Sequence, residues 1–271
     1  MSNSLEIASL LIDEFHSLIN MLPRYIDLDK HKEIYKIIFE IFYQAVNRRT
    51  LLLKNLCKDV RLSRILQHVR RTLNIVSGII DRRVANIQTL AHEMLRRAYI
   101  VLAEVPENTP KYVIVCDGLS IVDAVYIAFR LKKENMEPFV APLINPGGIT
   151  ETYKFILEPR SYLQYGNLTL NVIAHSIAKK ICAKDAIVFR GYDDYIHRLR
   201  NIHAVNIINT MYSLTSKLYS KIAWMKSEFN GMIMLLSDHG YDVIAEDVNM
   251  CKVEHCWRPR ALSVIASLLV V

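Results

Sequence analysis

Residues 232–240 read MIMLLSDHG, an apolar run that stops at an acid and an imidazole. The apolar residues 232–236 have the length and composition of a buried strand. Asp238 and His239 stand side by side directly after Ser237, and Gly240 follows them. The stretch therefore predicts a strand whose carboxyl end carries polar groups.

Similar apolar runs recur after residue 110, and helix-like segments separate them. The predicted strands are 112–116 (YVIVC), 139–144 (FVAPLI), 186–191 (AIVFRG), 232–237 and a closing strand at 261–271. The predicted helices between them cover 120–135, 168–180 and 200–228. Strands that alternate with helices indicate an α/β fold with a mainly parallel sheet covered by helices on both faces.

The first hundred residues have a different pattern. Apolar residues recur there at spacings of three and four, which is typical of helices. The predicted helices cover 3–21, 29–46, 48–79 with interruptions, and 81–104, with Asp81 as a candidate cap of the last one. Prolines at 106 and 110 indicate a linker. We therefore predict an N-terminal helical bundle over 1–108 and an α/β domain over 109–271.

Composition limits the class of protein. The chain has 271 residues, of which 52% are hydrophobic, which is ample for a core. A membrane-spanning helix needs roughly 20 apolar residues, and no run approaches that length, so no membrane contact is expected. The five cysteines are irregularly spaced, which favours a reduced, cytoplasmic protein. Cys251, His255 and Cys256 could share a zinc ion, although small buried thiols are the favoured interpretation.

Positive charge is concentrated in one segment. The whole chain carries a net charge of +7, whereas residues 48–97 hold twelve Lys and Arg against three Asp and Glu, a surplus of nine. On charge alone, a solvated helix face is the favoured explanation. The alternative is a surface that attracts nucleic acid or another anionic partner.

Polar residues that can bind metal follow the predicted strands. In open α/β sheets, ligands bind beyond the carboxyl ends of the strands. The residues found there are Asp117, Thr150 and Thr152, Asp193, Asp194 and His197, Asp238 and His239, with His255 preceding the last strand. Each of them alone has an ordinary structural explanation, such as a turn, a helix cap or a packed histidine. Their shared placement after successive strands favours a joint site.

Three carboxylates and three imidazoles from separate loops suit two zinc or manganese ions. Two divalent ions bring +4 and the carboxylates of Asp117, Asp193 and Asp238 bring −3, so the site keeps about +1. Such a site favours an anionic phosphate ester as substrate. A threonine hydroxyl beside the ions would serve as the nucleophile.

The ordered set of these residues resembles the alkaline phosphatase superfamily, and within it the PglZ domain. The segments that carry the resemblance are VCDGLS (115–120), DDYIH (193–197) and SDHG (237–240), within residues 110–271. The resemblance implies an alkaline-phosphatase-like core. It also implies that Asp117, Asp238 and His239 hold one ion together with the Thr150 oxygen, and that Asp193, His197 and His255 hold the other. Zinc is the usual metal in this family.

The resemblance also implies an activity. Thr150 would attack phosphorus and form a phosphoenzyme, as in a phosphodiesterase or phosphatase, and the basic segment makes nucleotides or nucleic acid attractive substrates. Thr152 remains an alternative nucleophile, because Gly147 and Gly148 offset the proline that the family shows before its nucleophile. The alternative function is a non-catalytic PglZ-type module that binds other proteins in a defence or signalling complex.

Overall fold

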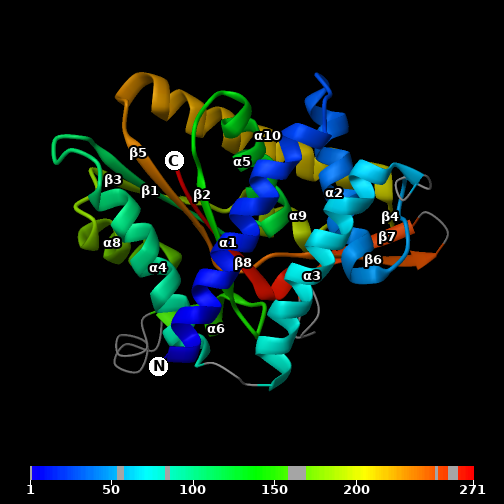
Figure 1. Ribbon diagram of the computed structural model, residues 1–271, viewed down its shortest axis with the longest axis horizontal. Coiled ribbons are helices and arrows are strands. Elements are labelled where there is room, and N and C mark those ends of the chain that lie inside the picture. The colour runs from blue at the N-terminus through cyan, green and yellow to red at the C-terminus, as the bar shows by residue number, and fades with distance from the viewer. Residues whose placement is uncertain (1, 54–57, 83–85, 158–168, 248–249, 256–261) are drawn as a thin grey trace.

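The computed structural model describes residues 2–53, 58–82, 86–157, 169–247, 250–255 and 262–271. These residues form two sheets with the strand orders β2-β8-β5-β1-β3 and β4-β7-β6 (Figure 1). The strands are β1 (Lys111–Cys116), β2 (Phe139–Ile144), β3 (Asp185–Phe189), β4 (Ile202–His203), β5 (Met232–Ser237), β6 (Asp242–Asp247), β7 (Met250–Glu254) and β8 (Ile265–Val270).

The larger sheet is mainly parallel, as the sequence predicts. Strand β1 pairs in parallel with β3 and β5, whereas β8 runs antiparallel to both β5 and β2. The antiparallel direction of β8 follows from the path of the chain. After β5 the chain forms β6 and β7 and returns to the sheet at the carboxyl ends of the parallel strands, so β8 runs back in the opposite direction. The closing strand is also shorter than predicted, since residues 262–264 form a 3-10 turn.

Helices cover both faces of this sheet. The described helices are α1 (Ser2–Tyr25), α2 (His31–Asn47), α3 (Val60–Arg82), α4 (Ile87–Ala103), α5 (Ile121–Lys133), α6 (Thr150–Leu157), α8 (Leu170–Lys180), α9 (Gly191–Ile196) and α10 (Ala204–Phe229). The connections through α5 (from β1 to β2) and through α10 (from β3 to β5) run toward the β2 edge of the sheet. The connection through α8 (from β2 to β3) runs toward the β3 edge. Right-handed connections therefore place α5 and α10 on one face and α8 on the opposite face (Figure 1).

The structure does not confirm a separate N-terminal bundle. Helix α1 contacts β2 and α5, and α4 contacts β2 and β8, so both lie directly on the sheet. The apolar stripe of α1 is at most 1% exposed and consists of Ala8, Leu11, Phe15, Leu18 and Leu22. The helical periodicity is therefore real, but these helices use it to cover the α/β core. Helix α2 packs against α5 and α10, and α3 packs against α1 and α2.

Two predicted helix starts are wrong. Asp81 lies inside α3, and the residue that caps α4 is Asn86, whose side chain accepts the backbone N–H groups of Gln88 and Thr89. Helix α3 begins at 60 rather than 48. Before it, the fully buried Glu40 accepts the backbone N–H groups of Leu51 and Leu52, which holds that segment in a non-helical turn.

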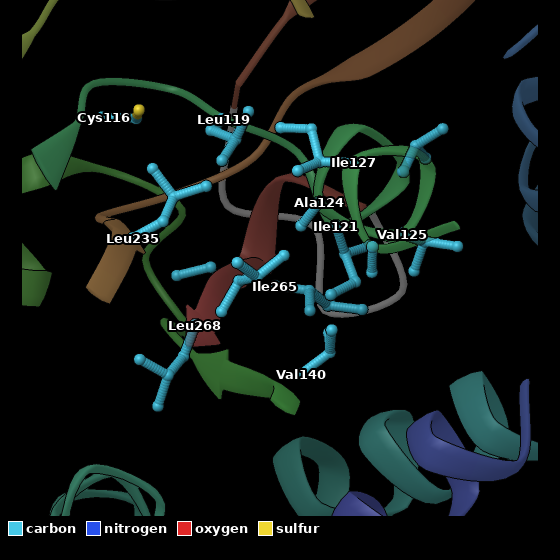
Figure 2. Close-up of a cluster of buried hydrophobic side chains, with 14 of the residues drawn as sticks. Cys116, Leu119, Ile121, Ala124, Val125, Ile127, Val140, Leu235, Ile265 and Leu268 are labelled. Carbon is cyan, nitrogen blue, oxygen red and sulfur yellow. The ribbon is translucent and has the colours of Figure 1, made fainter. Parts of the chain in front are cut away.

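The core between α5 and β8 fixes the start of α5. Figure 2 shows Ile121, Ala124 and Ile127 of α5 on the side of the helix that faces Ile265 of β8. Ile121, Val125, Ile265 and Leu268 are at most 2% exposed. Each such side chain contributes about 1.5–3 kcal/mol by leaving water. This packing holds the segment after β1, which carries Asp117, at the carboxyl edge of the sheet.

The smaller sheet was not predicted. Strand β7 pairs antiparallel with both β4 and β6, and β7 ends one residue before His255. Because residues 202–203 form β4, the long helix begins at Ala204 rather than at 200. Among the helical residues that the structure describes, no helix is long and apolar enough to cross a membrane.

Candidate metal centre

The carboxyl ends of the parallel strands bring the predicted ligands together. Cys116, the last residue of β1, is in register with Ser237 of β5 and with Phe189 of β3. Asp117 directly follows β1 and Asp238 directly follows β5, so the two residues lie side by side at the carboxyl edge of the sheet. Sheet register alone therefore joins sequence positions that are more than a hundred residues apart.

The first set of ligand atoms, here the Asp238 group, consists of Asp117, Thr150, Asp238 and His239. The Thr150 hydroxyl donates to Oδ2 of Asp238 at 2.7 Å. Nε2 of His239 lies 3.6 Å from Oδ2 of Asp238 and 3.6 Å from Oδ1 of Asp117. Asp238 and His239 are buried, and 17% of the Asp117 side chain is exposed. The group is thus open to solvent mainly on the side of Asp117 and Thr150.

The second set, the Asp193 group, consists of Asp193, His197 and His255. Asp193 lies on α9 and His197 directly follows this helix, four residues on, with Oδ1 of Asp193 3.2 Å from Nε2 of His197. Nε2 of His255, which follows β7, lies 3.2 Å from Nε2 of His197 and 3.6 Å from Oδ1 of Asp193. This group is the more exposed of the two, since 58% of the His197 side chain is accessible.

The two groups adjoin each other. Ligand atoms of Asp117, Asp193 and His239 all lie within 4.8 Å of one another. The rings of His239 and His255 have centroids 4.4 Å apart. Asp193 therefore borders both groups, a position that the motifs do not reveal.

The spacing of these atoms suits a divalent ion. With bonds of about 2.0–2.1 Å, two ligands of a tetrahedral zinc ion lie about 3.3 Å apart. The three distances within the Asp193 group are 3.2, 3.2 and 3.6 Å. His239 is 3.6 Å from each of its two carboxylate neighbours. Carboxylate oxygen and imidazole nitrogen are both zinc and manganese ligands, so the donor set and its spacing fit.

The charges of the two groups affect each other. Burial lowers the pKa of His239, but the carboxylates of Asp238 and Asp117 outweigh this effect and raise the pKa to about 9. Burial raises the pKa of Asp238, although the positive charge of His239 acts to lower it. Burial and the positive charge of His239 lower the pKa of His255, which favours the neutral imidazole that binds metals. A bound ion would displace the proton from His239.

Gly118 is a site residue that the sequence reasoning missed. Its N–H donates to Oδ1 of Asp238 at 3.0 Å. Its φ of +83° lies in the left-handed region, and an added Cβ would come within 2.9 Å of the Ile196 side chain and 3.4 Å of His239. Glycine therefore permits both the turn after Asp117 and the close approach of the histidine.

Asn145 is a second residue that the sequence reasoning missed. It is fully buried directly after β2, and its Nδ2 donates to the backbone carbonyls of Asp238 at 2.8 Å and of Ile149 at 2.9 Å. The signal was present, because Asn145 occupies the same position after its strand as Asp117 and Asp238 do after theirs.

The structure distinguishes the two candidate nucleophiles. Thr150 is the first residue of α6 and its hydroxyl contacts Asp238. The Thr152 hydroxyl instead faces the turn, since a Cβ on Gly147 would lie 2.1 Å from it. Ser120 caps α5, with its side chain accepting the N–H of Val122.

The remaining candidate residues lie outside these groups. Asp194 is exposed on α9, and the buried Cys251 lies within β7. Cys256, the other cysteine of the alternative zinc site, lies outside the residues that the structure describes.

Fold and site together define an α/β protein whose Asp and His side chains could hold metal ions at the carboxyl edge of the sheet. No protein-family model matches the chain, and neither does any curated protein. The resemblance to the alkaline phosphatase superfamily therefore rests on the motifs and their spacing.

Proposed function

We propose that the protein is a metal-dependent phosphoryl-transfer hydrolase, a phosphodiesterase or phosphatase of the PglZ-like kind, with Thr150 as its nucleophile. The observation that carries the proposal is the contact of 2.7 Å between the Thr150 hydroxyl and Asp238, inside a group that also contains Asp117 and His239. A hydroxyl in this position is held by the same carboxylate that would bind an ion.

Asp117, Asp238 and His239 would hold one zinc or manganese ion, and Asp193, His197 and His255 the other. Bound divalent ions supply positive charge that polarises a phosphate ester and favours loss of the nucleophile's proton. Before reaction, Oδ2 of Asp238 accepts a hydrogen bond from the Thr150 hydroxyl and so orients it. The backbone N–H of Gly118 and the N–H of His239 hold the other Asp238 oxygen, Oδ1, at 3.0 and 2.9 Å.

Phosphoryl transfer then proceeds in two steps. Oγ1 of Thr150 loses its proton to solvent and forms a bond to phosphorus while the bond from phosphorus to the alcohol leaving group breaks, and the leaving oxygen takes a proton from water. A second water molecule then cleaves the bond between phosphorus and Oγ1, which restores the Thr150 hydroxyl and releases a phosphate monoester from a diester substrate, or phosphate from a monoester. The exposure of His197 leaves the second group accessible to the leaving group and to water.

A nucleotide or nucleic-acid substrate is the finer part of the proposal, and the surplus of positive charge in residues 48–97 supports it. Part of that charge is neutralised by ion pairs, which join Arg61 to Asp59, Arg71 to Glu14, and Arg96 and Arg97 to Glu93. Binding of a single-stranded oligonucleotide should weaken steeply with added salt. Binding that is insensitive to salt, or absent at low salt, would remove nucleic acid from the proposal.

The activity is tested with bis-p-nitrophenyl phosphate in the presence of zinc or manganese. We expect turnover by the wild type and by Thr152→Ala, and none by Thr150→Ala. Loss of activity only in Thr152→Ala would show that the nucleophile is misassigned. Metal-free protein without turnover under either ion would favour the alternative, a binding or assembly module.

A further inference from the structure

A second polar cluster lies beneath the candidate metal centre, around the fully buried Asp123 of α5. Its Oδ1 accepts hydrogen bonds of 2.7 Å from the hydroxyls of Tyr35 and Thr215. Its Oδ2 accepts the backbone N–H of Ser120 at 3.3 Å. None of these residues is a candidate metal ligand.

Two further tyrosines complete this Asp123 cluster. The Tyr192 hydroxyl donates to Oγ1 of Thr215 at 3.0 Å. The Tyr241 hydroxyl lies 3.3 Å from that of Tyr35. The members come from separate parts of the chain, namely α2 (Tyr35), α5 (Asp123), α9 (Tyr192), α10 (Thr215) and the segment between β5 and β6 (Tyr241).

The cluster lies close along the chain to three of the segments that carry candidate ligands. Ser120 follows Asp117 by three residues and Tyr241 follows His239 by two, while Tyr192 directly precedes Asp193. Three segments that carry candidate ligands are therefore tied, directly or through one hydroxyl, to a single buried carboxylate. The hydrogen bond from Tyr35 of α2 links the same carboxylate to the N-terminal helices.

A buried carboxylate of this kind is costly unless hydrogen bonds satisfy it. Burial raises the pKa of Asp123 to about 6, although the hydrogen bonds from Thr215, Tyr35 and Tyr241 oppose that rise. The carboxylate holds its donors in fixed positions, because a displaced donor would leave it unsatisfied. In metal sites, groups that hydrogen-bond to the ligands set the orientation of those ligands. The Asp123 cluster lies one step further back, because it holds Ser120, Tyr192 and Tyr241, which neighbour the candidate ligands along the chain.

We propose that Asp123 is a positioning residue of the metal centre, and that Tyr35 makes the N-terminal helices part of its support. The inference rests on the proposed metal centre. It assigns to α2, which supplies no candidate ligand, a measurable contribution to metal affinity.

The test is titration of the metal-free protein with Co²⁺, followed by its visible absorption, and with Zn²⁺ in competition with a chromophoric chelator. We expect Tyr35→Phe and Thr215→Val, which remove one hydroxyl each and keep the shape, to weaken binding about 10–100-fold. Thr215→Ser restores the hydroxyl and should bind like the wild type. An altered Co²⁺ spectrum in the first two variants would show displaced ligands, which a loss of stability alone does not produce.

Tyr126→Phe is the matched control. Its ring packs edge-on against that of Tyr35, with centroids 5.2 Å apart, and it belongs to the same aromatic group. Among the residues that the structure describes, its hydroxyl makes no hydrogen bond to Asp123 or to the hydroxyls that bind Asp123. We expect its metal affinity to stay within about twofold of the wild type, because Asp123 keeps its donors.

The outcomes separate the inference from the proposed function. Wild-type protein that binds no metal would overturn both. Wild-type binding with unchanged affinity in Tyr35→Phe and Thr215→Val would overturn the inference alone, as would equal weakening in Tyr126→Phe. Melting curves of the metal-free variants show which are folded at the titration temperature. If Tyr35→Phe is not folded there, the comparison of Thr215→Val with Thr215→Ser decides.

Discussion

The side-chain amide of Asn145 donates a hydrogen bond of 2.8 Å to the backbone carbonyl of Asp238, 93 residues further along the chain. The same amide group donates to the carbonyl of Ile149, one residue before Thr150. Asn145 thus ties the segment that leads to the proposed nucleophile to the segment that carries Asp238 and His239. The candidate site is held by polar bonds between strand ends as well as by the sheet.

Asn145→Ala should lower the free energy of unfolding by about 1–3 kcal/mol, because the buried carbonyl of Asp238 and the partly buried carbonyl of Ile149 lose their donor. Urea unfolding of the metal-free protein measures this loss. Asn206→Ala, an exposed change on α10, is the control and should stay within about 0.5 kcal/mol of the wild type. Equal stability of the two variants would show that the Asn145 amide does not hold these segments together.

Gly118→Ala and Gly78→Ala should have opposite effects. At Gly118 the φ of +83° strains any side chain, so we expect a loss of about 1–2 kcal/mol in unfolding free energy. Gly78 lies within α3 and has no atom within 4 Å of an added Cβ, so alanine should stabilise the helix by about 0.5–1 kcal/mol. Thermal unfolding of both variants tests the pair, and a stabilising Gly118→Ala would contradict the turn.

Much of the fold was accessible from local pattern. Apolar runs that alternate with helical segments predicted the α/β class and the mainly parallel sheet, and the structure confirms both. Strand ends then indicated where to look for ligands, because parallel strands share one carboxyl edge. The structure brings all six candidate ligands to that edge, whereas their metal binding and the role of Thr150 stay predictions.

The remainder depends on contacts that a single sequence does not encode locally. The apolar stripe of α1 predicts a helix but does not say that it faces β2. Asp123 sits in an ordinary capping pattern with Ser120, and only the fold brings Tyr35 to it. Asn145 was missed although its position after β2 was informative, because an amide is not a metal ligand of the expected type.

Asp123 should make stability depend on pH in a recognisable direction. Its pKa in the folded protein is about 6, above the ordinary value of about 3.9, so the folded state holds the proton more tightly than the unfolded state. This contribution is full below about pH 4 and is lost as pH rises through about 6. The difference of about two pKa units corresponds to roughly 3 kcal/mol.

Asp123→Asn cannot titrate and should remove this dependence. Urea unfolding of metal-free wild type and variant at several pH values between 4 and 7 gives the difference between their slopes, in which the other titrating groups cancel. We expect the stability of the wild type to fall relative to the variant as pH rises. Parallel curves would mean that Asp123 has the same pKa in both states.

The central claim is that the Asp238 and Asp193 groups converge on divalent metal ions. Elemental analysis after dialysis against zinc and removal of loosely bound ions tests it most directly. We predict about two zinc ions per chain for the wild type, and a loss of both when Asp193 and Asp238 are replaced together by Asn. Wild-type protein that retains no zinc, or a double variant that retains as much as the wild type, would contradict the account.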